Sequence, residues 1–115
     1  MRNASTNYFG SGFPEIVYER AILIELKEQN ILFESQLWKD IYYKELFIGK
    51  RKFDALVEKK ILVELKALPF MDTKWNMQIL NYLKVFDIDV GLLLNFGGAS
   101  LQFKRFVNPK FFKLA

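Results

Sequence analysis

The spacing of apolar side chains near the start of the chain has a helical period. Between residues 14 and 29, apolar positions recur every three or four residues, and Val17, Ala21 and Ile24 define the centre of the stripe. This spacing predicts an amphipathic helix that packs one face on another element. Pro14 suits its first turn, where a backbone N–H is not needed. Further apolar residues widen the stripe: Phe13, Ile16, Leu23 and Leu26.

After residue 30 the pattern changes to that of β-strands, because β-branched and aromatic residues become frequent. Short charged turns, at residues 44–45 and 58–60, divide this region. Gly49 marks an expected β-bulge. Three consecutive strands are therefore predicted: residues 31–43, 46–57 and 61–68.

The second half of the chain predicts one more helix and two more strands. Asp72 or Thr73 can cap a helix that runs to about residue 86. The nearly all-apolar segment 89–96 predicts a strand buried on both faces, and the alternating segment 101–107 predicts an edge strand. The order of elements indicates an α/β fold in which helices pack on a central mixed sheet. The second helix has four residues on its apolar stripe: Trp75, Ile79, Leu83 and Phe86.

The composition excludes several kinds of chemistry. The chain has 115 residues, enough for one domain with one core. It contains no Cys and no His, which excludes disulfides, Cys- or His-ligated metals and a serine–histidine triad. A general base must therefore be a carboxylate, a lysine or a tyrosine. The net charge of +4 suits a polyanionic partner, although many ordinary proteins share it.

Neither a membrane span nor a secretory signal is expected. The longest apolar runs, such as VGLLLNF, are far shorter than the ~20 residues of a membrane helix. The N-terminal segment lacks the apolar core of a signal peptide. Together with the absence of cysteine, these features predict a cytoplasmic protein.

Three ionisable residues, Asp54, Glu64 and Lys66, interrupt the predicted hairpin of residues 46–68. If Phe53 shares a face with the other apolar residues of its strand, a three-residue turn sets Asp54 opposite Glu64, with Lys66 on the same face. Two opposed carboxylates repel each other. A divalent cation such as Mg²⁺ would relieve this repulsion, and Lys66 could stabilise phosphate charge.

A plainer interpretation of the same residues is an ordinary solvent-facing sheet surface. Glu64 and Lys66 would then form an exposed ion pair that contributes less than ~1 kcal/mol. Leu56 and Leu62 lie on the predicted face of the carboxylates, however, and this makes that face partly apolar. A cleft is therefore favoured over open surface.

The pattern of Asp54 followed by Glu64-Leu65-Lys66 resembles the PD-(D/E)XK nuclease superfamily. The segment GFPEIVYERA, with Gly12, Glu15 and Tyr18 at three-residue spacing, is similar to the signature of the small bacterial GxxExxY proteins. Later segments follow in the order of that family, and the resemblance covers residues 10 to 107, approximately. These segments are YYK, FDALV, VELKAL, QILNYLK, VGLLLNFG and LQFKRFV.

This resemblance implies a restriction-endonuclease-like αβββαβ core in a single domain spanning residues 1–115, with residues 108–115 as a tail. It also implies hydrolysis of phosphodiester bonds in DNA or RNA with Mg²⁺ or Mn²⁺ as cofactor. The catalytic residues would be Asp54, Glu64 and Lys66. The metal ligands would be Asp54, Glu64, the backbone carbonyl of Leu65, and Glu15. Gln78 and Tyr82 would bind substrate.

Each of these assignments has a structural alternative. Glu15 lies in a first helical turn, where the helix dipole favours any carboxylate. Tyr18 could be a core residue, and Gln78 and Tyr82 could simply pair with each other on their helix. Glu34 and Gln36 also match the family, but could only line the sheet. The basic runs at residues 50–52 and 59–60 could touch phosphates or be solvated hairpin.

The sequence also departs from the family it resembles. Members usually have a longer first helix with a His, where this chain has Thr6, and a second His where this chain has Trp75. The first helix is therefore expected to be shortened, leaving a sheet edge open. Two alternatives follow: a catalytically inactive module that binds nucleic acid or a partner protein, and a homodimer formed through Phe111, Phe112 and that edge.

Overall fold

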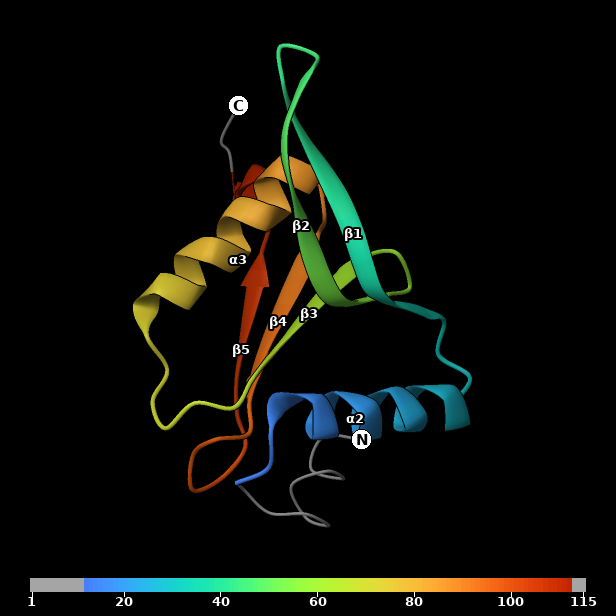
Figure 1. Ribbon diagram of the computed structural model, residues 1–115. Coiled ribbons are helices and arrows are strands. Elements are labelled where there is room, and N and C mark those ends of the chain that lie inside the picture. The colour runs from blue at the N-terminus through green and yellow to red at the C-terminus, as the bar shows by residue number, and fades with distance from the viewer. Residues whose placement is uncertain (1–11, 113–115) are drawn as a thin grey trace.

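The computed structural model describes residues 12–112 and has five strands in one mixed sheet, in the order β1-β2-β3-β4-β5 (Figure 1). Only β3 and β4 pair in parallel; the other neighbours are antiparallel. The predicted α/β fold and β5 as an edge strand are confirmed. The elements in chain order are α2 (Glu15–Glu28), β1 (Phe33–Tyr43), β2 (Leu46–Val57), β3 (Ile61–Lys66), α3 (Thr73–Phe86), β4 (Val90–Asn95), β5 (Gln102–Val107) and the 3-10 helix η1 (Pro109–Phe112).

The two helices pack on opposite faces of the sheet, so the core has two parts. On one face, α2 packs on apolar residues of β2 and β3, including Ala55, Val63 and Leu65. On the other face, α3 packs on Leu62 and Leu93. The sheet is therefore the middle layer of three. Within residues 12–112, no helix has the length and apolar character that crossing a membrane requires.

The face that α2 buries differs from the prediction. The buried apolar residues of α2 are Tyr18, Ile22 and Leu26, whereas Ile24, predicted at the centre of the stripe, is 58% exposed. The Tyr18 ring stacks on Phe96 with 4.6 Å between ring centroids. The predicted stripe was wrong because apolar residues occur on several sides of this helix. The side that is buried was decided by the sheet beneath it.

The β1–β2 hairpin extends well beyond the part of the sheet that the helices cover (Figure 1). Lys44 and Glu45 form its two-residue turn, with φ of 49° and 67°. The pairing moves from Ile41–Gly49 to Tyr42–Phe47, so β2 has one extra residue directly beside Gly49. The predicted bulge is thereby confirmed. The outer part of this hairpin carries exposed aromatic and aliphatic side chains on both strands.

Helix α3 lies close against β4 because Gly91 has no side chain. A Cβ at Gly91 would lie 2.8 Å from Ile79 Cδ1, which is too close for an unshifted contact. The helix begins at the predicted cap, where the Asp72 carboxylate accepts a hydrogen bond of 2.9 Å from the Lys74 N–H. This close contact fixes the height of α3 above the sheet, and with it the position of the side chains on its flank.

Candidate metal and nucleic-acid site

The candidate site forms where β2 and β3 separate. Their ladder has three residue pairs and ends at Ala55–Val63, which confirms the predicted register. Asp54 and Glu64 are the next residues on the two strands. The Leu65 N–H donates a 2.8 Å hydrogen bond to Asp54 Oδ2, so the carboxylate replaces the backbone partner that the parting strands no longer supply. The start of this gap therefore places Asp54 beside the β3 segment that carries Glu64 and Lys66.

Strand β1 is also irregular at this point. Ser35 pairs with Ala55 and Leu37 with Phe53, but Gln36 makes no ladder pair and has a φ of 50°. The prediction that Phe53 shares a face with Ala55 and Val57 was wrong. Phe53 packs in the core under α3, whereas Ala55 packs in the core under α2. The break in the pleat at this level explains how residues two apart point to opposite faces.

Helix α2 brings two carboxylates to the gap, Glu15 and Glu19. They lie four residues apart and therefore on one face of the helix. The Gln36 side-chain amide donates a hydrogen bond to Glu19 Oε1, which joins the irregular point of β1 to the helix. Glu19 is buried and was not among the predicted site residues. Its four-residue spacing from Glu15 was the signal that could have found it.

Glu64 occupies the least favourable electrostatic environment of the site. Burial, followed by the negative charge of Asp54, raises the pKa of Glu64 to about 8, against the opposing effect of Lys66. Its Oε1 atom is buried and has no hydrogen-bond partner within residues 12–112. An unpartnered buried carboxylate oxygen is costly unless a proton or a cation compensates it.

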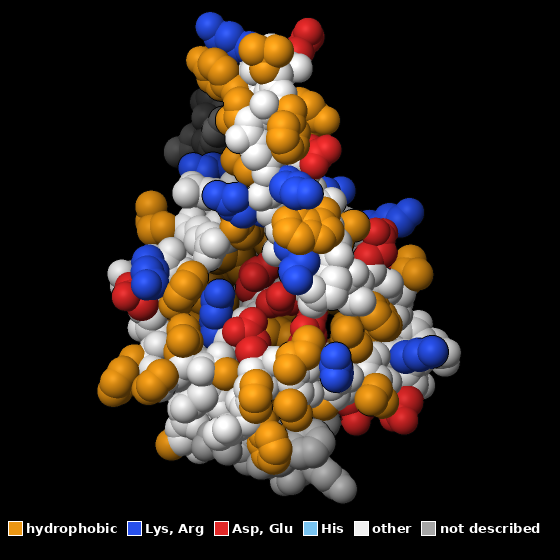
Figure 2. All heavy atoms as spheres, in the orientation of Figure 1, with side chains coloured by type: hydrophobic (Ala, Val, Ile, Leu, Met, Phe, Trp, Pro, Cys, Tyr) orange, Lys and Arg blue, Asp and Glu red, His pale blue; other side chains and the backbone are white. Residues whose placement is uncertain are grey.

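The neighbouring carboxylates are shifted in the same direction. Burial raises the pKa of Asp54, while the Leu65 N–H and the charges of Lys66 and Lys52 oppose the shift. Burial also raises the pKa of Glu15, and the charge of Asp54 adds to this effect. For Glu19, burial again raises the pKa, opposed first by the bond from Gln36. The four acidic groups therefore form one coupled cluster (Figure 2).

Lys66 lies between this cluster and the start of α3. Its Nζ atom is 3.9 Å from the centroid of the Trp75 ring, a cation–π contact. Directly after Lys66 the chain leaves the sheet, and the buried Asn95 side chain accepts from the Leu68 N–H and donates to the Leu68 carbonyl. These contacts hold both the ammonium group and the backbone that follows it.

A cleft of about 500 Å³ lies beside Trp75, between α3 and β2. Gln78 and Tyr82 line it, and the Gln78 side-chain amide donates a 2.7 Å hydrogen bond to the Tyr82 hydroxyl. Arg51 and Lys74 add two cations to the same cleft. Gln78 and Tyr82 thus pair with each other, as their structural alternative proposed, and they line a basic cleft. Substrate binding by this pair stays a prediction.

Known proteins share the sequence pattern and the fold of this chain. A comparison with known protein families matches residues 4–106 to the PD-(D/E)XK nuclease superfamily. The chain belongs to this superfamily. No curated protein matches it. Among solved structures, the crystal structure of SSO0001 is similar, with a TM-score of 0.64 and 19% sequence identity. The alignment covers 83% of this chain and 50% of SSO0001, so the chain spans half the length of that protein.

Proteins of this superfamily generally use divalent metal ions, and the carboxylates of this site are of the ligand type that such an ion prefers. Hard cations such as Mg²⁺ prefer carboxylate and carbonyl oxygens. The unpartnered Glu64 oxygen and the raised pKa of Asp54 mark two half-buried acids that a cation would compensate. Within residues 12–112, no group of three acidic side chains has an arrangement that could by itself hold a metal ion. A cation here would therefore take the rest of its ligands from backbone, water or substrate.

Other predicted residues lie outside this cluster. Tyr18 is fully buried against Phe96, as its structural interpretation proposed. Glu34 is exposed on β1. Phe111 and Phe112 are 55% and 71% exposed on η1. Thr6 and the shortened start of the first helix lie outside the described residues.

Proposed function

We propose that this chain is a divalent-metal-dependent nuclease of the small GxxExxY type, cleaving phosphodiester bonds of DNA or RNA in the cytoplasm. The observation that carries this proposal is Glu64, a half-buried acid beside Asp54 whose buried Oε1 atom has no hydrogen-bond partner among the described residues. A surface ion pair would not be buried in this way, and a structural role would leave the oxygen hydrogen-bonded. Perturbed carboxylates that share a site are typical of functional residues.

The residues of the site would divide the chemistry between them. Asp54, Glu64, the Leu65 carbonyl and Glu15 would hold Mg²⁺ or Mn²⁺. The bound ion would supply charge neutralisation at the phosphodiester and a more acidic water. Lys66, oriented by the Trp75 ring, would stabilise the negative charge that develops on the phosphate oxygens.

Gln78 and Tyr82 would bind substrate in the cleft beside Lys66. Their side chains can exchange the hydrogen bond between them for bonds to a phosphate or sugar. Arg51 and Lys74 supply positive charge around the same cleft. Glu19, held by Gln36, would place negative charge at the other side of the gap. This charge would add to the attraction of Glu15 and Asp54 for a cation.

The test is calorimetric titration of Mn²⁺ into the wild type and into Asp54→Asn, beside cleavage assays on single- and double-stranded oligonucleotides. Asp54→Asn keeps an acceptor for the Leu65 N–H but loses the charge. Asp40→Asn, an exposed carboxylate on the same hairpin, is the matched control. Metal binding and cleavage that disappear in Asp54→Asn and persist in Asp40→Asn are the expected result.

Two further measurements sharpen the assignment. Because Glu64 is mostly protonated near neutral pH without metal, Mn²⁺ binding should release a proton, seen as a binding enthalpy that depends on the buffer. Lys66→Gln should retain metal binding but lose cleavage. Asp54-dependent binding without any cleavage would instead favour the inactive binding module, and cleavage surviving in both Asp54→Asn and Lys66→Gln would refute the mechanism.

A further inference from the structure

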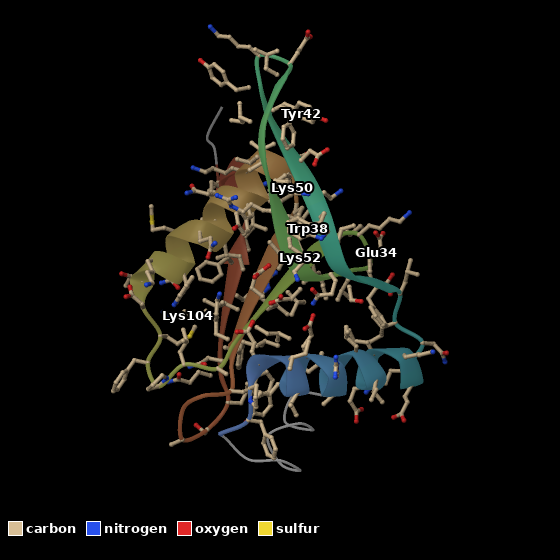
Figure 3. The ribbon with its side chains drawn as sticks, viewed as in Figure 1. Glu34, Trp38, Tyr42, Lys50, Lys52 and Lys104 are labelled. Carbon is tan, nitrogen blue, oxygen red and sulfur yellow. The ribbon has the colours of Figure 1, made fainter. Side chains whose placement is uncertain are left out.

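The outer part of the β1–β2 hairpin carries an aromatic side chain between two lysines, Trp38 with Lys50 and Lys52. Trp38 is 55% exposed, and the Nζ atoms of Lys50 and Lys52 lie 4.8 Å and 5.8 Å from the centroid of its ring. Trp38 pairs with Lys52 in the ladder, and Asp40 pairs with Lys50. Figure 3 shows the three side chains together on the hairpin. We call these three residues the Trp38 strip.

Nothing in the fold requires this combination. Phe53 and Leu37 pack against the core under α3, but Trp38 belongs to neither core. Within the described residues, neither Lys50 nor Lys52 lies within ion-pair distance of a carboxylate. The two ammonium groups contact the indole instead, and all three side chains are exposed, so a ligand can reach them. An exposed ring flanked by cations favours a ligand that has both flat aromatic groups and negative charge.

The strip continues directly into the candidate site. Lys52 is two residues from Asp54 along β2, so it lies where the exposed hairpin meets the acidic cluster. Figure 2 shows the acidic side chains gathered in a hollow of this face, with Lys and Arg side chains around it. A chain molecule that lies on the strip would therefore reach the acidic cluster without crossing another element.

We propose that the Trp38 strip binds an unpaired segment of nucleic acid and leads it to the site. A base stacks on an indole only when its flat face is free, and in a duplex both faces of each base are covered by neighbours. Lys50 and Lys52 would contact the phosphates on either side of the stacked base. The proposal rests on the proposed function for the fate of the bound strand, but its binding step does not depend on catalysis.

The test is fluorescence anisotropy with a labelled thymidine oligonucleotide, single-stranded or annealed to its complement, in the presence of a chelator. Trp38→Ala should weaken binding of the single strand by about tenfold, in line with the loss of one stacked base. Lys50→Gln with Lys52→Gln should weaken binding and reduce its salt dependence by about 1.4 units of log K per log salt, or about 0.7 for each lysine. The wild type should bind the single strand more tightly than the duplex.

Matched variants separate the strip from general charge and apolar exposure. Lys27→Gln with Lys84→Gln removes two exposed helical lysines, and Phe70→Ala removes a side chain that is 84% exposed. Both variants should bind like the wild type. Circular dichroism of every variant checks that the fold is retained.

Three results would overturn the proposal: equal binding by Trp38→Ala and wild type, tighter binding of duplex than of single strand, or no binding by the wild type. The last would point to a protein partner for this surface. Failure of the proposed nuclease function is a different result, in which the oligonucleotide binds through Trp38 but Mn²⁺ produces no cleavage.

Discussion

The two halves of β2 lie in opposite surroundings, one exposed and one in the core. The first half, residues 46–52, has three cations and three exposed apolar side chains, and neither α2 nor α3 covers its outer end (Figure 1). The second half, residues 53–57, has a single charged residue, Asp54, among four buried apolar ones. One continuous strand therefore leaves the core partway along its length.

Because of this difference, a charged residue is stronger evidence of function in the buried half than in the exposed half. In the buried half, burial is the largest cause of the raised pKa of Asp54, so its charge is costly and needs a compensating partner. In the exposed half, a lysine costs almost nothing, and a single lysine there says little about function. There, only the combination of Lys50 and Lys52 with Trp38 indicates a ligand.

The largest expected effect tests whether the two halves differ in packing. Phe53→Ala should destabilise the fold by roughly 3–5 kcal/mol, because the Phe53 ring is fully buried against α3. Phe47→Ala should cost less than about 1 kcal/mol, because its ring is 57% exposed. Urea denaturation of both variants measures the difference. Similar losses in the two variants would mean that the outer hairpin is packed against something in solution.

The next effect is the pH dependence caused by Glu64. Its pKa is about 8 in the fold and 4.5 ordinarily, so the folded state holds the proton more tightly. The resulting stability is fully present below pH 4.5 and is lost as the pH rises to about 8, by up to about 1.4 kcal/mol per pH unit. Denaturation in a chelator at several pH values measures this slope.

The Glu64→Gln variant serves as the comparison, since it has no proton to lose and should flatten the curve. Glu34→Gln, on an exposed position of β1, should leave it unchanged. With Mn²⁺ present, the wild type should instead gain stability as the pH rises, because only the ionised carboxylate binds the metal. If the free energy of unfolding of the wild type did not change with pH in the absence of metal, the raised pKa of Glu64 would be contradicted.

A smaller effect compares the two cation–π pairs. Lys66 lies 3.9 Å from the half-buried Trp75 ring, whereas Lys50 lies 4.8 Å from the exposed Trp38 ring. Double-mutant cycles with Lys→Gln and Trp→Leu should give about 1–2 kcal/mol of coupling for the first pair and about 0.5 kcal/mol for the second. Equal couplings would contradict the difference in burial between the two sites.

The smallest effect is the stability change on losing a lysine of the exposed half. Lys50→Gln should change the free energy of unfolding by less than about 0.5 kcal/mol, because the side chain has no ion pair among the described residues. Thermal unfolding of Lys50→Gln beside wild type measures this. A loss well above that value would assign Lys50 a structural role and weaken the case for a ligand surface.

Local patterns predicted most elements of this fold closely. Strand β2 and helix α3 have the predicted extents, since turn residues and a capping Asp mark their ends. Strand β3 is shorter than predicted and ends at Lys66. Beyond that point the Asn95 side chain, rather than a neighbouring strand, bonds the backbone of Leu68. The residues around positions 67–68 form no local pattern that predicts a hydrogen-bond partner 27 residues away.

The sequence by itself determined the order of elements, the register that sets Asp54 beside Glu64, and the family resemblance. These depend on side-chain periodicity, turn length and motif spacing, all of which are local. Only the tertiary structure decided which side of α2 is buried, how Glu19 and Gln36 join the site, and where the strands part. Those features depend on contacts between distant segments. The same contacts remove the carboxylates from water, and this burial is what raises their pKa values.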